Sequence, residues 1–338
     1  MTETFGVVFD IDGVLMKDGV VIPRAAEALS LLHDQATGQP IVPYVFVTNN
    51  GGFTEREKAD KISSVLGFKI EEDRVMVAHT PMRPLAERYA DGNVLIVARN
   101  HQTALNLAKW YGFKNCTSIY EYVEKRPYLN PGRRCTFWTT GVQTDYKIDE
   151  PQEKEQLPFK AIIFFENPED WGESIQVMSD ILQSKDGLIS MNHIDRSETQ
   201  VIDLHVANPD FSYGGEFVLP RYTTGALITC LSTLFKIETG NDLKVTFYGK
   251  PEATTYQYAK VLMDAQLKKL NLAAPKHIYA IGDNPQSDIM GANRLEHEGW
   301  VSILVRTGVF KGDNDAKNPA KHVVDNVYEA IQLIRKQH

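Results

Sequence analysis

The sequence predicts an α/β protein with an open, mostly parallel sheet and a second α/β domain inserted into it. Three observations predict this fold: apolar runs of strand length, helical patterns between them, and one long interruption of the alternation. Such alternation is typical of βαβ units, which build parallel sheets. At 338 residues, the chain is long enough for about two domains of roughly 100 to 200 residues each.

Five segments have the composition of strands that are buried on both faces. They are short, rich in β-branched residues and nearly all apolar, as is typical of parallel sheets covered by helices. We expect these strands at residues 5–9, 43–47, 244–248, 277–281 and 301–305.

Helix start signals lie between these strands. Pro23 and Pro251 are each expected to open a helix, because proline suits the first helical turn. Thr54 and Glu57 have the spacing of a capping box, in which each side chain binds a backbone N–H group of the other. We therefore expect helices from Pro23, from Thr54 and from Pro251.

The interruption predicts a domain with its own strands and helices. Apolar runs occur at 93–97 and 161–165, and Trp171, Ile175, Met178 and Leu182 fall on one helical face. The charged segment 143–158 contains two prolines and is expected to be a loop. We predict a core made of residues 1–77 and 211–338 and an inserted domain made of residues 78–210.

Composition excludes several functional classes. The 36 Lys and Arg residues against 44 Asp and Glu give a net charge of −8, which repels nucleic acid. No run of about 18 apolar residues is present, so we expect no membrane span. The three cysteines form no CxxC pair and the nine histidines form no HExxH motif, so neither suggests zinc.

Cysteine use and the first residues predict the compartment. Three cysteines without a pairing pattern are typical of reduced thiols in an intracellular protein. Residues 1–6 are too few for a secretory signal, so the sequence as written predicts a cytoplasmic protein. The alternative is a mitochondrial protein from which a presequence has been removed.

Two aspartates follow the first expected strand. Asp10 and Asp12 are separated by one residue at the end of that strand, where open α/β sheets bind ligands. A calcium loop is disfavoured, because it would need oxygen ligands at positions 14 and 21, where Val14 and Val21 stand. Asp18 and Gly19 between short apolar runs predict a tight hairpin beside the pair.

Polar residues also follow three later strands. Thr48, Asn49, Asn50 and Gly51 combine a hydroxyl group with backbone N–H groups that suit a phosphate oxyanion. Lys250 can neutralise a phosphate or pair with a carboxylate. The last motif is the run Gly282-Asp283-Asn284-Pro285-Gln286-Ser287-Asp288. Asp283 can bind a hard cation, and Asp288, with Asn284 beside it, can orient the groups that surround the cation's ligands.

The four motifs in this order, DxDG, TNN, GKP and GDNxxSD, resemble those of the haloacid dehalogenase superfamily. The insertion after the second motif and the phrase Asn208-Pro209-Asp210 resemble subfamily IIA, the NagD-like phosphatases with a C2 cap. Gly51-Gly52 and the run from Phe164 to Trp171 are most similar to the branch named for the cat eye syndrome critical region protein. The resemblance implies a Rossmann-like core with an inserted cap.

The resemblance also implies a mechanism, which is the hydrolysis of a small phosphorylated metabolite through an aspartyl-phosphate. Asp10 is implied as nucleophile and Asp12 as general acid and base. Thr48 and the Asn49 amide are implied to hold the transferring oxygens, beside Asn50 and Gly51, with Lys250 offsetting their charge. Mg²⁺ is implied to bind the carboxylates of Asp10 and Asp283 and the backbone carbonyl of Asp12.

Other classes fit the residues less well. A dehalogenase would have no acid/base aspartate at Asp12, a transporting ATPase would need membrane helices, and a receiver domain would be about 120 residues long. A catalytically weak binding or scaffold protein on the same fold stays open as the alternative, because a fold does not prove activity. The substrate stays open as well, and the resemblance implies a possible homodimer.

Overall fold

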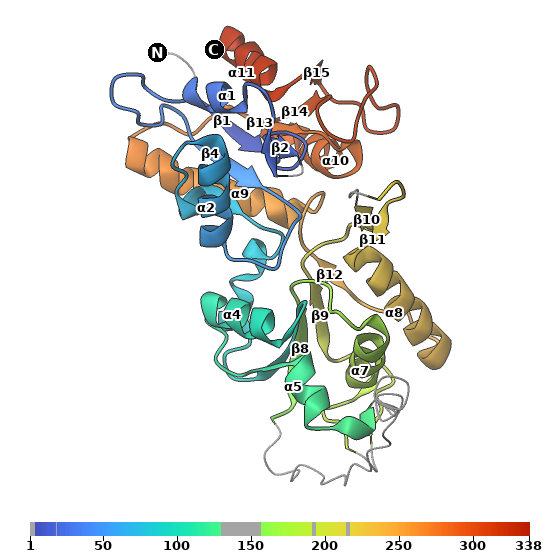
Figure 1. Ribbon diagram of the computed structural model, residues 1–338. Coiled ribbons are helices and arrows are strands. Elements are labelled where there is room, and N and C mark those ends of the chain that lie inside the picture. The colour runs from blue at the N-terminus through green and yellow to red at the C-terminus, as the bar shows by residue number, and fades with distance from the viewer. Residues whose placement is uncertain (1–3, 18, 130–156, 191–193, 214–216) are drawn as a thin grey trace. The chain divides into compact units, whose positions relative to one another are not determined.

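The computed structural model describes residues 4–17, 19–129, 157–190, 194–213 and 217–338 (Figure 1). It divides into two compact units, which we call the core unit and the insertion unit. The core unit consists of Met1–Pro81 and Gly249–His338, and the insertion unit of Met82–Tyr248.

The core unit is built on a six-stranded parallel sheet. The central strand pairs through Phe9 with Ile281 on one side and with Phe46 on the other. In sheet order the strands are β15 (His322–Val324), β14 (Trp300–Val305), β13 (His277–Gly282), β1 (Phe5–Phe9), β4 (Tyr44–Val47) and β5 (Val75–Met76). The predicted parallel α/β sheet is therefore confirmed, with two short strands, β5 and β15, that the pattern did not indicate.

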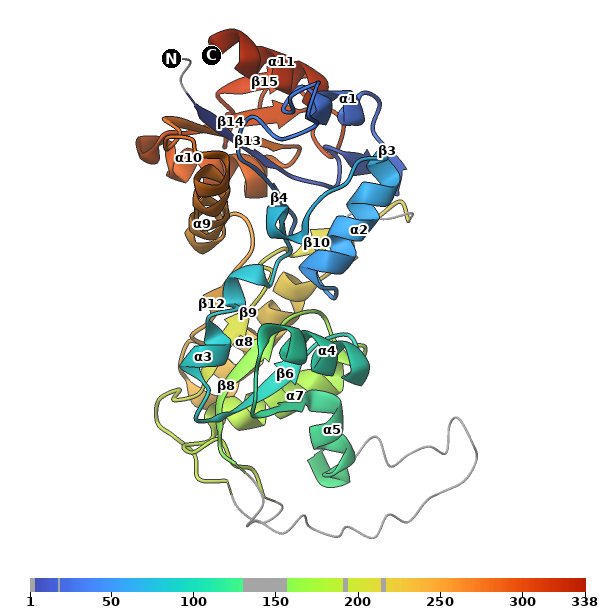
Figure 2. The same cartoon turned by 90° about the vertical axis from the view of Figure 1, so that its left-hand side faces the viewer.

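Helices cover both faces of this sheet (Figure 2). Side chains alternate along β1, so Val7 and Phe9 contribute to the core on one face and Val8 to the core on the other. The Val7 face packs against α1 (Ala25–Ser30), α2 (Glu55–Leu66) and α11 (Val327–Gln337). The Val8 face packs against α9 (Ala253–Leu270) and α10 (Met290–Arg294).

The helix starts follow the expected signals closely. The capping box is present: the Glu57 N–H group donates to Thr54 Oγ1, and the Thr54 N–H group donates to the Glu57 carboxylate. Pro23 and Pro251 each lie two residues before their helix, because Arg24 and Glu252 take the N-cap positions of α1 and α9. Those two helices therefore begin slightly later than predicted.

The insertion unit contains a five-stranded parallel sheet of its own. In sheet order its strands are β12 (Thr246–Phe247), β9 (Asp203–Val206), β8 (Phe159–Phe164), β6 (Asn93–Val97) and β7 (Cys116–Ser118). Among its described residues the helices are α3 (Leu85–Arg88), α4 (His101–Tyr111), α5 (Ile119–Glu124), α7 (Trp171–Gln183) and α8 (Thr224–Thr239). Leu204 and Val206 pack with apolar residues of α5, α7 and α8 in one core.

The insertion ends later than the sequence analysis predicted, at Tyr248 and not at residue 210. Leu231 and Phe235 bury the apolar face of α8 in the core of the insertion unit. Strand β12 pairs with β9, with Thr246 opposite His205. The run at 244–248 is therefore an edge strand of the inserted sheet, and the prediction that it belongs to the core sheet was wrong.

Short elements complete the two units. The predicted hairpin is present as β2 (Met16–Lys17) paired with β3 (Val20–Val21), and a second hairpin pairs β10 (Ser212–Tyr213) with β11 (Arg221–Tyr222). Short helical turns occur at Glu72–Arg74, Thr80–Met82, Pro127–Leu129, Pro285–Ile289 and Glu296–Glu298. The expected loop at 143–158 lies outside the described residues except for its last two positions. In the part of the chain that is described, no helix is both long and apolar enough to cross a membrane.

Candidate active site

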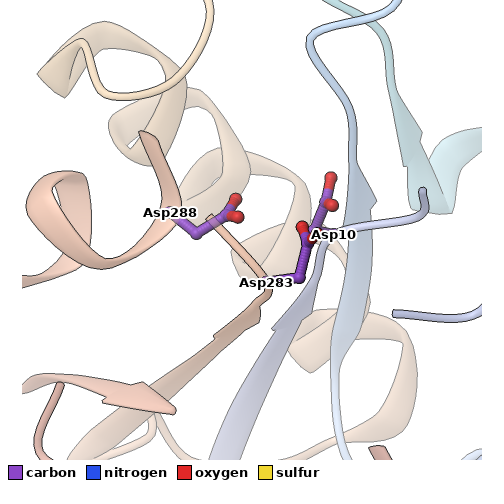
Figure 3. A group of neighbouring side chains, drawn as sticks. All are labelled: Asp10, Asp283 and Asp288. Atoms are coloured by element: carbon purple, nitrogen blue, oxygen red, sulfur yellow. The ribbon is translucent and has the colours of Figure 1, made fainter. Parts of the chain in front are cut away.

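Three buried carboxylates lie at the carboxyl ends of two neighbouring core strands (Figure 3). Asp10 follows β1, Asp283 follows β13, and Asp288 lies in the short helical turn after β13. One oxygen from each carboxylate lies within 4.8 Å of the others. The side chains are far apart in sequence, and parallel pairing of β1 with β13 places them at one edge of the sheet.

Lys250 joins this cluster as its cation. Its Nζ lies 2.5 Å from Asp10 Oδ1 and 2.7 Å from Asp288 Oδ1, and it also donates to the Val47 carbonyl oxygen at 3.0 Å. The lysine is 4% exposed, so these charge-assisted bonds are shielded from water. The ammonium group therefore ties the predicted nucleophile to the turn that contains Asp288.

The side chain of Asn49 holds the backbone of Lys250. The Lys250 N–H group donates to Asn49 Oδ1 at 2.6 Å, and Asn49 Nδ2 donates to the Lys250 carbonyl oxygen at 2.7 Å. Sequence analysis assigned the Asn49 amide to the transferring phosphate oxygens. That assignment stays a prediction. The structure shows the Asn49 side-chain amide bound to the backbone of Lys250, whose ammonium group contacts Asp10.

The Thr48 hydroxyl group contacts both the backbone of Asn50 and the side chain of Asp12. Thr48 Oγ1 accepts from the Asn50 N–H group at 3.0 Å and lies 3.5 Å from Asp12 Oδ2, to which it donates. The Asn50 side chain accepts from the Gly51 N–H group at 3.0 Å. These bonds hold the turn that begins at Thr48, and they place Asn50 and Gly51 in that turn rather than in the carboxylate cluster.

Asp12 stands apart from the three buried carboxylates. Its side chain is 55% exposed, and its Oδ2 atom lies 3.8 Å from Nζ of Lys58, a buried lysine on α2. The sequence motifs did not indicate Lys58. The available signal was its spacing, because Lys58, Ile62 and Leu66 lie four residues apart on the buried face of one helix.

Burial and mutual repulsion perturb the acidic groups. Burial raises the pKa of Asp10 well above its ordinary range, and the carboxylates of Asp288 and Asp283 add to the rise against the opposing Lys250 ammonium. Burial, with the Asp288 carboxylate, likewise raises the pKa of Asp283 to about 6. Burial alone would lower the pKa of Lys250, but the Asp10 and Asp288 carboxylates raise it above its ordinary value. When ionised, the three carboxylates outnumber the one ammonium group of the cluster.

This donor set fits a hard divalent cation. Carboxylate oxygens are the preferred ligands of Mg²⁺ and Ca²⁺, and three carboxylates with one ammonium leave a charge that such a cation would offset. Asp288 was predicted to orient the groups around the ligands of the cation. Its carboxylate lies in the cluster with those of Asp10 and Asp283. Asn284 supports it, because its N–H group donates to Asp288 Oδ2 at 3.1 Å.

Two glycines allow the backbone to approach Asp283 closely. Gly13 has a φ of +85°, and a Cβ atom there would lie 2.4 Å from Asp283 Oδ2. A Cβ atom at Gly308 would lie 1.7 Å from the same oxygen. The Val309 N–H group donates to that oxygen at 2.6 Å, and Thr307 Oγ1 donates to the Gly13 carbonyl oxygen at 2.5 Å. The loop after β14 thus fixes Asp283, a role that the sequence pattern did not indicate.

Two family models match the chain, over ranges that include residues of both units. Residues 7–114 match a model described as haloacid dehalogenase-like hydrolase, and residues 247–330 match one described as HAD-hydrolase-like. A curated relative from Schizosaccharomyces pombe, a fusion protein of cardiolipin synthase and a mitochondrial hydrolase, is 34% identical over 330 residues. That match covers 97% of this chain, which spans about half (52%) of the relative's length. A mitochondrial hydrolase from Saccharomyces cerevisiae is 29% identical over 346 residues, covering 96% of this chain and 93% of the relative.

Solved structures share the fold over nearly the whole chain. NagD from E. coli has a TM-score of 0.58 at 17% identity, covering 97% of this chain and 98% of its own. A p-nitrophenyl phosphatase from Archaeoglobus fulgidus has a TM-score of 0.59 at 18% identity, covering 98% and 99%. A glycerol phosphate phosphatase from Mycobacterium tuberculosis in complex with magnesium has a TM-score of 0.58 at 19% identity, covering 97% and 77%. At these identities the likeness shows a shared α/β core with an insertion.

Proposed function

Because the chain belongs to the haloacid dehalogenase-like hydrolases, we propose that it is a magnesium-dependent phosphatase that hydrolyses a small phosphate monoester through an aspartyl-phosphate. The observation on which this proposal depends is the contact of the Asp10 carboxylate with Lys250 beside Asp283 and Asp288. Solved neighbours named as phosphatases, one of them in complex with magnesium, support the class of reaction and the choice of ion.

In the proposed first step, a carboxylate oxygen of Asp10 attacks phosphorus and the bond from phosphorus to the ester oxygen breaks. The nucleophile must be ionised, although burial favours its neutral form. The Lys250 ammonium at 2.5 Å stabilises the carboxylate. Asp12 gives its proton to the departing ester oxygen.

In the proposed second step, Asp12 acts as a carboxylate. It takes a proton from a water molecule, whose oxygen attacks the phosphorus of the aspartyl-phosphate and releases Asp10. The partial exposure of the Asp12 side chain is consistent with access to water. In this proposal the buried Asp10 and the half-exposed Asp12 take the separate roles that the resemblance implies.

The carboxylates of Asp10 and Asp283 and the backbone carbonyl of Asp12 would hold the ion, with the Asp288 carboxylate in the same cluster. When bound, Mg²⁺ supplies positive charge that offsets the carboxylates and the oxygens of a phosphate group. Thr48 would hold a transferring oxygen through its hydroxyl group. Asn49 would contribute by holding Lys250, as its two hydrogen bonds indicate.

Release of phosphate from p-nitrophenyl phosphate, with and without Mg²⁺, tests the proposal. We expect wild type to be active only with the ion, and Asp10→Asn to lose activity by about 1,000-fold or more, because a nucleophile has no substitute. Asp264→Asn, the same change at an exposed position of α9, serves as the matched control. Equal rates for wild type and Asp10→Asn would exclude Asp10 as nucleophile. An absence of turnover across a broad panel of phosphate esters would favour the alternative, a binding or scaffold protein.

We also propose a mitochondrial location in place of the cytoplasmic one, because the two curated relatives from yeasts described above carry the words mitochondrial hydrolase in their names. Fractionation of cells that express the full-length protein tests it, and recovery outside the mitochondrial fraction would overturn it. The homodimer implied by the resemblance also stays a proposal, which analytical ultracentrifugation can test.

A further inference from the structure

The core unit buries a second lysine that the proposed mechanism does not use. The side chain of Lys58 is only 3% exposed, although lysine is among the residues least often buried. Helix α2 fixes its position, because the Lys58 N–H group donates to the carbonyl oxygen of Thr54, the N-cap residue, at 3.1 Å. A buried ammonium group destabilises the folded state unless an opposite charge lies close to it.

For Lys58 that opposite charge is the carboxylate of Asp12. The Lys58 ammonium lies 3.8 Å from Asp12 Oδ2 and 5.2 Å from the centre of the Phe53 ring. The Thr48 hydroxyl group approaches the same Asp12 oxygen at 3.5 Å. Two groups from different elements, one a cation and one a hydroxyl, therefore converge on one oxygen of a half-exposed carboxylate.

We infer that Lys58 is a positioning residue for Asp12. A half-exposed aspartate can adopt several staggered rotamers, and the two contacts favour one of them. In the proposed first step the proton passes from the Asp12 carboxyl group to the ester oxygen as its bond to phosphorus breaks, which leaves a carboxylate beside the ammonium of Lys58. This inference rests on the proposed function and adds Lys58 to its acid/base machinery.

Leaving-group dependence distinguishes this role from a structural one. An ester with a good leaving group, such as p-nitrophenyl phosphate, needs little protonation, whereas phenyl phosphate needs more. For Lys58→Met we expect kcat/KM to fall at least about tenfold with phenyl phosphate and less than about threefold with p-nitrophenyl phosphate. Lys268→Met, at an exposed lysine of α9, is the matched control and should change neither value.

The Asp12→Asn background provides the second measurement. If Lys58 acts through Asp12, adding Lys58→Met to Asp12→Asn should leave the ratio of the two kcat/KM values unchanged. Equal losses on both esters for Lys58→Met alone, or a ratio that still changes in the Asp12→Asn background, would overturn the inference. Turnover by wild type that depends on Asp10 tests the proposed function separately, so the two failures are distinguishable.

Discussion

Three buried carboxylates and one buried ammonium group lie where β1 and β13 end. Lys250 pairs with Asp10 and Asp288, both of them buried, while Asp283 receives an N–H group from the backbone. A buried ion pair contributes little net stability, but removing one partner leaves an uncompensated charge. The folded core unit should therefore depend strongly on Lys250.

Replacing this lysine tests that dependence. We expect Lys250→Ala to lower the free energy of unfolding, measured without divalent ions by urea denaturation, by about 3 to 5 kcal/mol. Lys269→Ala removes an exposed lysine that pairs with Asp73 and should cost less than about 1 kcal/mol. Similar losses for the two variants would contradict the view that the buried cluster depends on Lys250.

The sequence predicts some site residues better than others. Asp10 and Asp283 directly follow apolar strands, so their meeting at one sheet edge follows from parallel pairing. Lys58 and the place of Asp288 in the cluster depend on helix packing and on the path of a turn, which no local pattern specifies. The hydrogen bonds of the Asn49 side chain were not predicted for a similar reason, since their partner is the backbone of a residue 201 positions away.

At the scale of single elements, β9 is anchored by a buried histidine. His205 is 2% exposed; its Nε2 atom lies 2.8 Å from the Tyr89 hydroxyl group and its Nδ1 atom 3.1 Å from the Tyr248 hydroxyl group. The Tyr89 hydroxyl group donates to Asp203 at 2.5 Å, which leaves its oxygen to accept from a neutral imidazole. Both ring nitrogens are thus satisfied without a positive charge.

This network predicts a dependence of stability on pH. Burial lowers the pKa of His205 to about 4, against the opposing effect of Asp203. Between the ordinary value of about 6.5 and that lowered value, the unfolded chain binds the proton more tightly. The stabilising contribution of neutral His205 is therefore fully present above a pH of about 6.5. It is lost as the pH falls to about 4, and this loss lowers the free energy of unfolding by at most about 3 kcal/mol.

Urea denaturation across that pH range checks the prediction. His205→Gln should be less stable than wild type near neutral pH and should lose less stability on acidification, because glutamine does not titrate. His297→Gln, at a histidine that is 73% exposed, should keep the wild-type dependence. An unchanged dependence in His205→Gln would show that other groups govern the acid response.

Strand β12 shows where element prediction reaches its limit. Its apolar pattern predicts a strand at 244–248, and a strand is present at Thr246–Phe247. The pattern contains no information about which sheet the strand joins, and long-range pairing with β9 decides this. The apolar face of α8 is buried in the core of the insertion unit, so this helix too lies beyond the predicted end of the insertion at residue 210.

In the molecule as a whole, the candidate active site belongs to one of two units that have separate hydrophobic cores. All the residues of the candidate active site lie in the core unit, although two segments far apart in sequence supply them. A cation that binds the folded carboxylate cluster and not the unfolded chain must stabilise the core unit by mass action. The proposed metal site can thus be tested without knowledge of the substrate.

Metal addition and removal provide that test. With Mg²⁺ at about 100 times its dissociation constant, we expect the free energy of unfolding of wild type to rise by about 3 kcal/mol, and chelation to reverse the change. Asp283→Asn should abolish the stabilisation, and Asp242→Asn, at an 85% exposed side chain, should retain it. Equal stabilisation of Asp283→Asn and wild type would place the ion elsewhere.

Trapping the phosphoryl group on the protein tests most directly whether Asp10 is the nucleophile. Wild type is mixed with p-nitrophenyl phosphate and Mg²⁺, quenched rapidly in acid, and mapped by peptide mass spectrometry. We expect a phosphoryl group on the peptide that contains Asp10, and none there in Asp10→Asn. Phosphoryl transfer to another residue, or full turnover by Asp10→Asn, would contradict this role of Asp10.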